Sequence, residues 1–182
     1  MIGESGCGKS TAAKLAARFW DADRGKITVG GVDVKAVDPE ELLKAYAIVF
    51  QDVTLFNNTV KENIRIGRQG ASDEEVLQAA RAAQCDGFVD KLPNGYDTVI
   101  GENGSMLSGG ERQRISIARA IMKDAPIIIL DEATANVDPE NEKELMEAVA
   151  ELTHNKTVIM IAHRLKTCLL YTSPSPRDRT RS

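Results

Sequence analysis

A glycine-rich loop near the start of the chain constrains the fold more than any other feature. Residues 3–10 read GESGCGKS and fit the pattern G-x-x-x-x-G-K-[ST], in which backbone N–H groups close around phosphate oxygens at a helix N-terminus. Residues 9–20 carry Ala, Leu and Lys at helical spacing, so the loop is predicted to open a helix. A plain glycine turn that caps a helix is the alternative, but it does not account for the Lys-Ser pair.

The loop supplies a set of candidate phosphate and metal ligands. Lys9 is expected to neutralise the β- and γ-phosphates, and Ser10 is expected to place its hydroxyl on Mg²⁺. The full set of predicted binding residues in this loop is Gly3, Ser5, Gly6, Cys7, Gly8, Lys9, Ser10 and Thr11.

A second candidate site follows the apolar run at 127–130, where Asp131 and Glu132 are adjacent. Open α/β sheets bind ligands at the carboxyl ends of their strands, which is where these two carboxylates are predicted to lie. Phosphoryl transfer needs mainly positioning and charge neutralisation, so we assign Asp131 to Mg²⁺ and Glu132 to the general base. The alternative is an acidic turn after a strand, which does not explain the spacing from the glycine loop.

The periodicity of the remaining segments predicts an α/β fold with a mostly parallel sheet. Apolar runs at 127–130 and 157–161 are typical of strands buried on both faces, and an amphipathic helix is predicted between them at 139–152. Residues 26–34 indicate a hairpin around a Gly-Gly pair. Two capping boxes, Thr59 with Glu62 and Ser72 with Glu75, predict a helical lobe in the middle of the chain.

The segment LSGGERQR at 107–114 predicts a second anion site. Ser108 and Glu111 form a capping box, so Ser108 is expected to be an N-cap. The two glycines behind it, Gly109 and Gly110, leave the helix N-terminus open to close approach by an anion. Two phosphate sites in one chain suggest a nucleotide held between partners.

Composition narrows the classes of partner. The 27 acidic residues nearly balance the 23 basic ones, so no broad basic surface for nucleic acid is expected. Cys7, Cys85 and Cys168 show no C-x-x-C spacing, and no metal site of the Cys/His type is predicted. The apolar stretches fall short of the roughly 20 residues that span a bilayer.

Taken together, these motifs resemble the ABC ATPase family over residues 1–167. The Walker A motif lies at 3–11, the Q-loop at Gln51, the signature at 107–114, the D-loop at 135–138 and the H-loop at His163. The resemblance implies a P-loop NTPase (RecA-like) core with an ABC-type helical subdomain at about 55–122. ATP and Mg²⁺ are the implied cofactors.

The same resemblance implies a head-to-tail dimer with ATP buried between each Walker A motif and the partner's signature. Ser108 and Gly110 would contact the γ-phosphate held by the other copy, with Gly109 between them. Gln51 would sense Mg²⁺ and the attacking water while touching a transmembrane partner. His163 would contact the γ-phosphate, and Asp138 would cap the next helix and reach across the dimer.

The segments 53–60 and 98–104 look like the exporter branch of the family. We therefore expect an ATP-hydrolysing subunit at the cytoplasmic face of the cell membrane, joined to a transmembrane domain in the same polypeptide. A mechanical ABC ATPase acting on DNA or ribosomes is one alternative; the absence of a sustained heptad pattern and the acidic charge disfavour it. An inactive fragment is another.

The ends of the chain carry a separate expectation. The family has strands before Walker A and elements after the H-loop, so the sequence is predicted to be truncated at both ends and unstable. Residues 168–182 are rich in Ser, Pro and Arg without periodicity and resemble a translated transposase adapter, which predicts a non-native or disordered tail.

Overall fold

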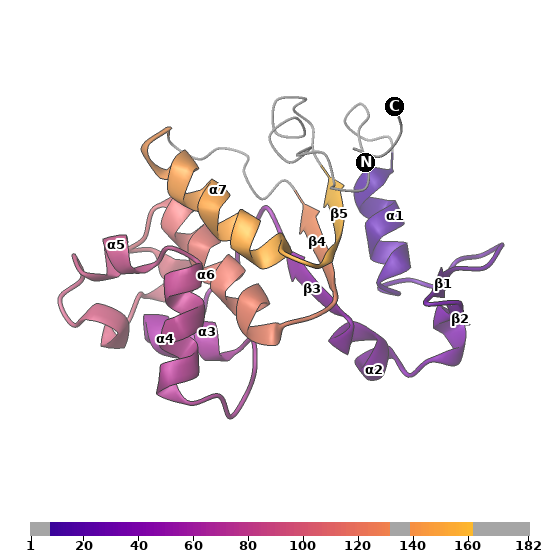
Figure 1. Ribbon diagram of the computed structural model, residues 1–182, viewed down its shortest axis with the longest axis horizontal. Coiled ribbons are helices and arrows are strands. Elements are labelled where there is room, and N and C mark those ends of the chain that lie inside the picture. The colour runs from indigo at the N-terminus through magenta and orange to yellow at the C-terminus, as the bar shows by residue number, and fades with distance from the viewer. Residues whose placement is uncertain (1–7, 132–138, 162–182) are drawn as a thin grey trace, which may run out of the picture.

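The computed structural model describes residues 8–131 and 139–161, which form a parallel sheet with helices on both of its faces (Figure 1). The helices are α1 (Lys9–Ala16), α2 (Pro39–Lys44), α3 (Val60–Arg65), α4 (Asp73–Ala82), α5 (Asp86–Val89), α6 (Gly109–Lys123) and α7 (Pro139–Thr153). The strands are β1 (Thr28–Val29), β2 (Val32–Asp33), β3 (Tyr46–Val49), β4 (Ile127–Asp131) and β5 (Thr157–Ile161). Short 3₁₀ turns lie at η1 (Val34–Ala36), η2 (Gly95–Asp97) and η3 (Glu102–Gly104).

The central sheet has the strand order β3-β4-β5, and both pairs are parallel. Val49 lies opposite Leu130, and Asp131 lies opposite Ile161. The α/β class and the parallel sheet are therefore confirmed. The predicted hairpin is also present, as the antiparallel pair β1 and β2.

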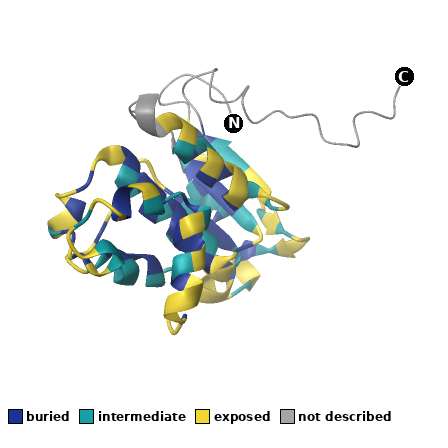
Figure 2. Cartoon of the chain, turned by 60° about the vertical axis from the view of Figure 1, so that its left-hand side comes forward, coloured by how far each residue is buried: buried dark blue, intermediate teal, exposed yellow. Residues whose placement is uncertain are grey.

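The two faces of the sheet pack against different helices. Ile128 and Leu130 of β4 are buried in a large cluster with residues of α6 and α7, whereas Ile129 is buried with α1 in a smaller cluster. Successive residues of a strand point to opposite faces, which produces this division. Figure 1 shows the sheet between α1 on one side and α6 and α7 on the other, and Figure 2 shows buried positions along the inner sides of these elements.

The prediction that both apolar runs are buried on both faces holds for β4 and is wrong for β5. Ile128, Ile129 and Leu130 are each at most 3% exposed, but Thr157 is exposed and Val158 is 37% exposed. Within the described residues β5 pairs with β4 alone and forms the edge of the sheet. Side chains at an edge lose the cover of a neighbouring strand on one side.

The first helix is shorter than predicted and ends at Ala16 rather than near residue 20. Arg18 has a left-handed backbone, with φ of 55°, which stops the helix. Its side chain turns away from α1, and Nη1 donates to the carbonyls of Val34 (2.9 Å) and Val37 (2.7 Å). The Phe19 N–H donates to the Lys14 carbonyl at 2.9 Å and the Arg18 N–H donates to the Leu15 carbonyl at 3.0 Å, so local backbone bonds close the helix. The spacing of Ala and Leu does not reveal this boundary.

Two of the three predicted capping boxes are complete, at Ser72 with Glu75 and at Ser108 with Glu111. The box at Thr59 is half formed. The Thr59 hydroxyl accepts from the Glu62 N–H at 3.1 Å, but the Thr59 N–H donates to Asn58 Oδ1 at 2.8 Å. The Glu62 carboxylate pairs instead with Arg65 Nε at 3.0 Å, so that ion pair replaces the second half of the box.

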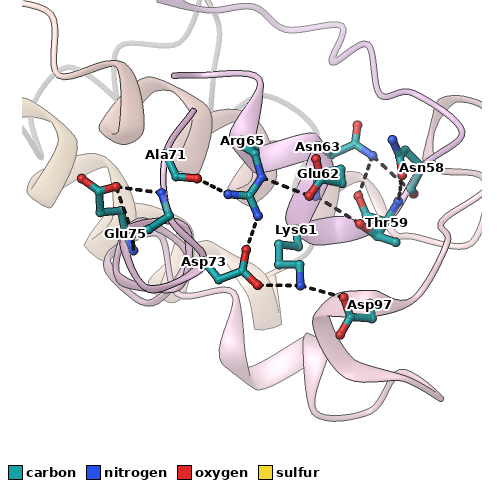
Figure 3. A network of polar contacts seen from close by, with 11 residues as sticks. Asn58, Thr59, Lys61, Glu62, Asn63, Arg65, Ala71, Asp73, Glu75 and Asp97 are labelled. Atoms are coloured by element: carbon teal, nitrogen blue, oxygen red, sulfur yellow. Dashed lines mark hydrogen bonds and ion pairs between the residues drawn. The ribbon is translucent and has the colours of Figure 1, made fainter. Parts of the chain in front are cut away.

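The helices α3, α4 and α6 pack together around fully buried apolar side chains such as Ile64, Val76 and Ile115. Charged side chains at the surface tie α3 to its neighbours (Figure 3). Arg65 pairs with Asp73 of α4, and Lys61 reaches both Asp73 at 3.0 Å and Asp97 at 2.9 Å.

Candidate functional site

Two of the predicted site residues, Gln51 and Asp131, lie at the carboxyl ends of neighbouring parallel strands. Because Val49 pairs with Leu130, Gln51 and Asp131 emerge from neighbouring strands at the carboxyl edge of the sheet. Gln51 is exposed and Asp131 is half-buried. The structure thus brings together Gln51 and Asp131, which are 80 positions apart in the sequence.

The N-terminus of α1 meets the requirements of a phosphate site. Gly8 precedes the helix with φ of +87°, a conformation that favours glycine, and Lys9 is 7% exposed. The first N–H groups of a helix have no partner within it, and together with the helix dipole they attract anions. Ala13 and Lys14 line a small pocket together with Asp131, so α1 lies beside the end of β4.

The described residues fit a nucleoside phosphate with Mg²⁺ better than a metal held by protein alone. The cation of Lys9, the helix N-terminus and the carboxylate of Asp131 supply complementary charges for both groups. Within the described residues no cluster of three or more His, Cys, Asp or Glu side chains could hold a metal. Mg²⁺ is commonly bound by one or two carboxylates together with substrate phosphates, which is the arrangement that Asp131 allows.

The predicted second anion site is the N-terminus of α6. The Ser108 hydroxyl accepts from the Glu111 N–H at 3.3 Å, and the Glu111 carboxylate accepts from the Ser108 N–H at 2.7 Å, which confirms the N-cap. Gly109 is exposed, and a Cβ placed on it meets no atom of the described residues within 4 Å. Gly110 is buried. The backbone at Gly109 is therefore open to close approach.

The two predicted anion sites lie on elements that cover opposite faces of the sheet. α1 belongs to the small cluster around Ile129, and α6 belongs to the large cluster around Ile128 and Leu130 (Figure 1). The two helix N-termini of one chain therefore belong to different faces of its sheet, and a nucleotide in contact with both types of site has to be explained with this separation in view.

Sequence reasoning missed three polar side chains beside Gln51. Gln113 is 5% exposed and donates from Nε2 to the Phe50 carbonyl at 3.3 Å. Arg119 donates from Nη1 to the Thr54 carbonyl at 2.6 Å and from Nη2 to the buried Asn63 side chain at 2.7 Å. The sequence signal that could have revealed them is the presence of polar residues at positions of α6 and α3 that face the interior.

A further ionic contact joins the signature helix to α7. Arg114 is 2% exposed, forms an ion pair with Glu144, and stands over the Phe88 ring at 5.2 Å from its centroid. Burial lowers the pKa of Arg114 from its usual value. Because α7 begins at Pro139, directly after Asp138, this contact links the signature helix to the helix that follows the D-loop.

An open groove of about 530 Å³ lies between the end of β3, the segment after Gln51 and α6. Phe50, Thr54 and Ile66 line it, and Phe50 and Ile66 are 39% and 48% exposed. Phe56, in the segment after Gln51, is 56% exposed, and the centroid of its ring lies 5.9 Å from Arg119 Cζ. Exposed apolar side chains beside a groove are typical of protein interaction sites.

Some predicted site residues lie outside the described residues. They are Gly3, Ser5, Gly6, Cys7, Glu132, Asp138 and His163. The side chain of Ser10 is likewise not described, although its backbone belongs to α1. Thr11 is exposed in the first turn of α1.

A family model described as ABC transporter matches residues 1–135. The chain belongs to the ABC transporter family. The matched residues include the glycine loop, Gln51, the signature and Asp131, so the family resemblance drawn from these motifs is confirmed.

Relatives within the ABC transporter family are similar over most of this chain. The β-(1→2)glucan export ATP-binding/permease protein NdvA of Brucella melitensis is 51% identical over 167 residues, 92% of this chain and 28% of that protein. The ATP-dependent lipid A-core flippase of Syntrophus aciditrophicus is 52% identical over the same length and the same shares. A solved structure of a bacterial Atm1-family ABC exporter with ATP bound matches with a TM-score of 0.84 and 46% identity, covering 91% of this chain and 29% of that chain.

The chain therefore spans less than a third of the length of these ABC transporter relatives. The structural match confirms the P-loop NTPase fold. Two of the three names contain the words export or exporter, which agrees with the exporter-type segments at 53–60 and 98–104.

Proposed function

We propose that the chain is an ATP-binding and ATP-hydrolysing domain that powers export across a membrane. The observation that carries the proposal is that α1, the helix that Lys9 begins, lies beside the carboxyl end of β4, where its Ala13 and Lys14 line a pocket together with Asp131. The names of the relatives and the ATP-bound exporter support the same function.

The proposed mechanism assigns each residue a task at the triphosphate. Lys9 and the backbone of the glycine loop neutralise and orient the phosphates. Ser10 and Asp131 hold Mg²⁺, which when bound neutralises charge on the phosphate oxygens. Glu132 accepts a proton from the attacking water, while Gln51 positions that water and His163 contacts the γ-phosphate. The remaining loop residues Gly3, Ser5, Gly6, Cys7, Gly8 and Thr11 complete the phosphate cradle.

A head-to-tail pair of these domains completes the proposed site. The two anion sites of one chain belong to helices on opposite faces of its sheet, which supports a nucleotide shared between two copies. Ser108, Gly109 and Gly110 of one copy then bind the γ-phosphate held by the other, and Asp138 reaches across the same interface.

The proposed membrane partner is a transmembrane domain of the same polypeptide, which places this domain at the cytoplasmic face of the membrane. The groove beside Phe50, together with the exposed Phe56, offers an apolar docking surface for it. Within residues 8–131 and 139–161, none of the helices combines the length and apolar character that crossing a bilayer requires.

The test is Glu132→Gln in the full-length exporter. The amide keeps the size of the carboxylate but cannot accept the proton, so Mg²⁺-dependent ATP hydrolysis should fall by about 10²-fold or more. Binding of a fluorescent ATP analogue should be retained, since the substitution leaves Lys9 and Asp131 in place. Turnover near the wild-type rate would remove Glu132 from the role of base, and absence of hydrolysis in the wild type would overturn the function itself.

A further inference from the structure

Helix α6, which carries most of the segment LSGGERQR, forms hydrogen bonds to the backbone both before and after Gln51. Before Gln51, the Phe50 carbonyl accepts from Gln113 Nε2 at 3.3 Å. After Gln51, the Thr54 carbonyl accepts from Arg119 Nη1 at 2.6 Å. Gln51 itself is exposed between these two points, so its position depends on a backbone that α6 fixes.

The second contact belongs to a larger polar network. Asn63 is fully buried, and its Oδ1 accepts from both the Phe56 N–H at 2.9 Å and Arg119 Nη2 at 2.7 Å. Its Nδ2 donates to the Phe56 carbonyl at 3.0 Å. The same Nδ2 donates to the Thr59 carbonyl at 2.9 Å (Figure 3). Arg119 Nε also donates to the Asn63 carbonyl at 2.6 Å. The loop after Gln51 is therefore fixed from its interior.

Burial makes these contacts specific. Burial lowers the pKa of Arg119 to about 10, so the guanidinium remains charged at neutral pH although desolvation opposes the charge. Arg119 is half-buried, and partial desolvation of a guanidinium is costly unless its N–H groups are paired; here carbonyl and amide oxygens accept from them. Gln113, at 5% exposed, carries the same requirement.

We infer that Gln113 and Arg119 are positioning residues, which transmit movement of α6 to Gln51. The N-terminus of α6 carries Ser108, Gly109 and Gly110, the residues assigned above to the partner's γ-phosphate. A shift of that end carries Gln113 with it, because Gln113 lies only about one helical turn after Gly109. When α6 binds the nucleotide held by the partner copy, it thereby sets the position of Gln51 relative to the nucleotide held by its own copy. The inference rests on the proposed function.

The experiment compares Gln113→Met, Gln51→Ala and the double variant in the full-length exporter, measuring kcat and the KM for ATP. Methionine keeps the length of the side chain and removes the donor. We expect kcat to fall about three- to tenfold with KM changed by less than about twofold, since the contact acts on hydrolysis rather than on binding. In the Gln51→Ala background the same substitution should have no further effect, because Gln113 acts through Gln51.

Lys123→Met is the matched control. Lys123 lies on the same helix and its Nζ also donates to a main-chain carbonyl, that of Leu43 at 2.9 Å, but this acceptor belongs to α2, which precedes β3, whereas Gln51 follows β3. We expect kcat unchanged and a loss of thermal stability comparable to that of Gln113→Met. Arg119→Lys, which keeps the charge but cannot reach Thr54 and Asn63 together, should lower kcat in the same direction and provides a second variant if Gln113→Met folds poorly.

The outcomes separate the inference from the proposed function. A normal kcat in both Gln113→Met and Arg119→Lys, or an additive loss in the double variant, would overturn the positioning role. A normal kcat in Gln51→Ala would overturn it as well, together with the role of Gln51. If the wild-type exporter shows no Mg²⁺-dependent ATP hydrolysis, the proposed function is overturned rather than the positioning role. Glu132→Gln tests the proposed function independently of Gln113 and Arg119.

Discussion

Gly109→Ala separates the stability of the fold from the proposed chemistry of the signature. Gly109 is the first residue of α6, and a Cβ there meets no atom of the described residues within 4 Å. Alanine is favoured over glycine within helices by about 0.5–1 kcal/mol, and less at a helix end. We therefore expect the free energy of unfolding to stay constant or rise by up to about 0.5 kcal/mol.

The same methyl group should be damaging when the nucleotide is engaged. In the proposed dimer, the backbone at Gly109 approaches a phosphate oxygen of the ATP held by the other copy, and a Cβ would occupy that space. Removing one hydrogen-bond donor from a developing charge costs about 10²–10³-fold in kcat in other enzymes, and displacing the backbone donors at Gly109 is expected to have an effect of the same order. We expect a loss of about 10²-fold.

The assay is steady-state ATP hydrolysis per folded molecule, together with thermal unfolding of the same samples. Gly67→Ala is the control, because a Cβ there would lie 3.0 Å from both the Arg119 carbonyl carbon and Met122 Cβ, and closer still to the Arg119 carbonyl oxygen. That crowding should destabilise the fold by about 1–3 kcal/mol. Hydrolysis per folded molecule should fall far less than in Gly109→Ala.

Two results would refute this reasoning. Wild-type hydrolysis by Gly109→Ala would show that no phosphate comes close to Gly109. Substantial destabilisation of Gly109→Ala would show that the space around it is occupied, against the geometry of α6.

Two more predictions concern the helical layer. Glu144→Gln should lower the free energy of unfolding by about 1–2 kcal/mol, less than the 3–5 kcal/mol typical of a fully buried pair. The reason is that Arg114 is 2% exposed while the Glu144 side chain is 44% exposed; chemical denaturation measures the effect, and an unchanged midpoint would contradict it. Cys85 is fully buried and burial raises its pKa to about 12, so it should resist iodoacetamide at pH 8 until the protein unfolds. Peptide mass spectrometry of labelled protein checks this, and rapid labelling of the folded state would show that the site opens.

The sequence motifs predicted the parallel sheet and the residues at the carboxyl ends of its strands, because each of these features depends on local sequence. An apolar run predicts a buried strand, and a residue directly after it must lie at the carboxyl end, which is how Asp131 was placed. The capping box at Ser108 was predictable for the same reason: all of its atoms lie within four residues.

Contacts between distant segments could not be predicted in this way. Gln113 and Phe50 are 63 positions apart, and Arg119 and Asn63 are 56 positions apart. Nothing in the local pattern of either segment specifies the other. The hydrogen bonds from Gln113 and Arg119 to the backbone on either side of Gln51 therefore follow only from the packing of α6. The exposure of Val158 has the same origin, because whether a strand lies at an edge depends on its neighbours.

The unequal division of the apolar interior has a thermodynamic consequence. Among the described residues, the cluster beneath α1 has seven buried members, against twenty-seven in the cluster beneath α6 and α7. Among the described residues, α1 thus packs on the smaller of the two apolar clusters. A ligand that binds only the folded state adds to stability by mass action, so bound ATP should protect the amides of α1 from hydrogen exchange more than those of α6.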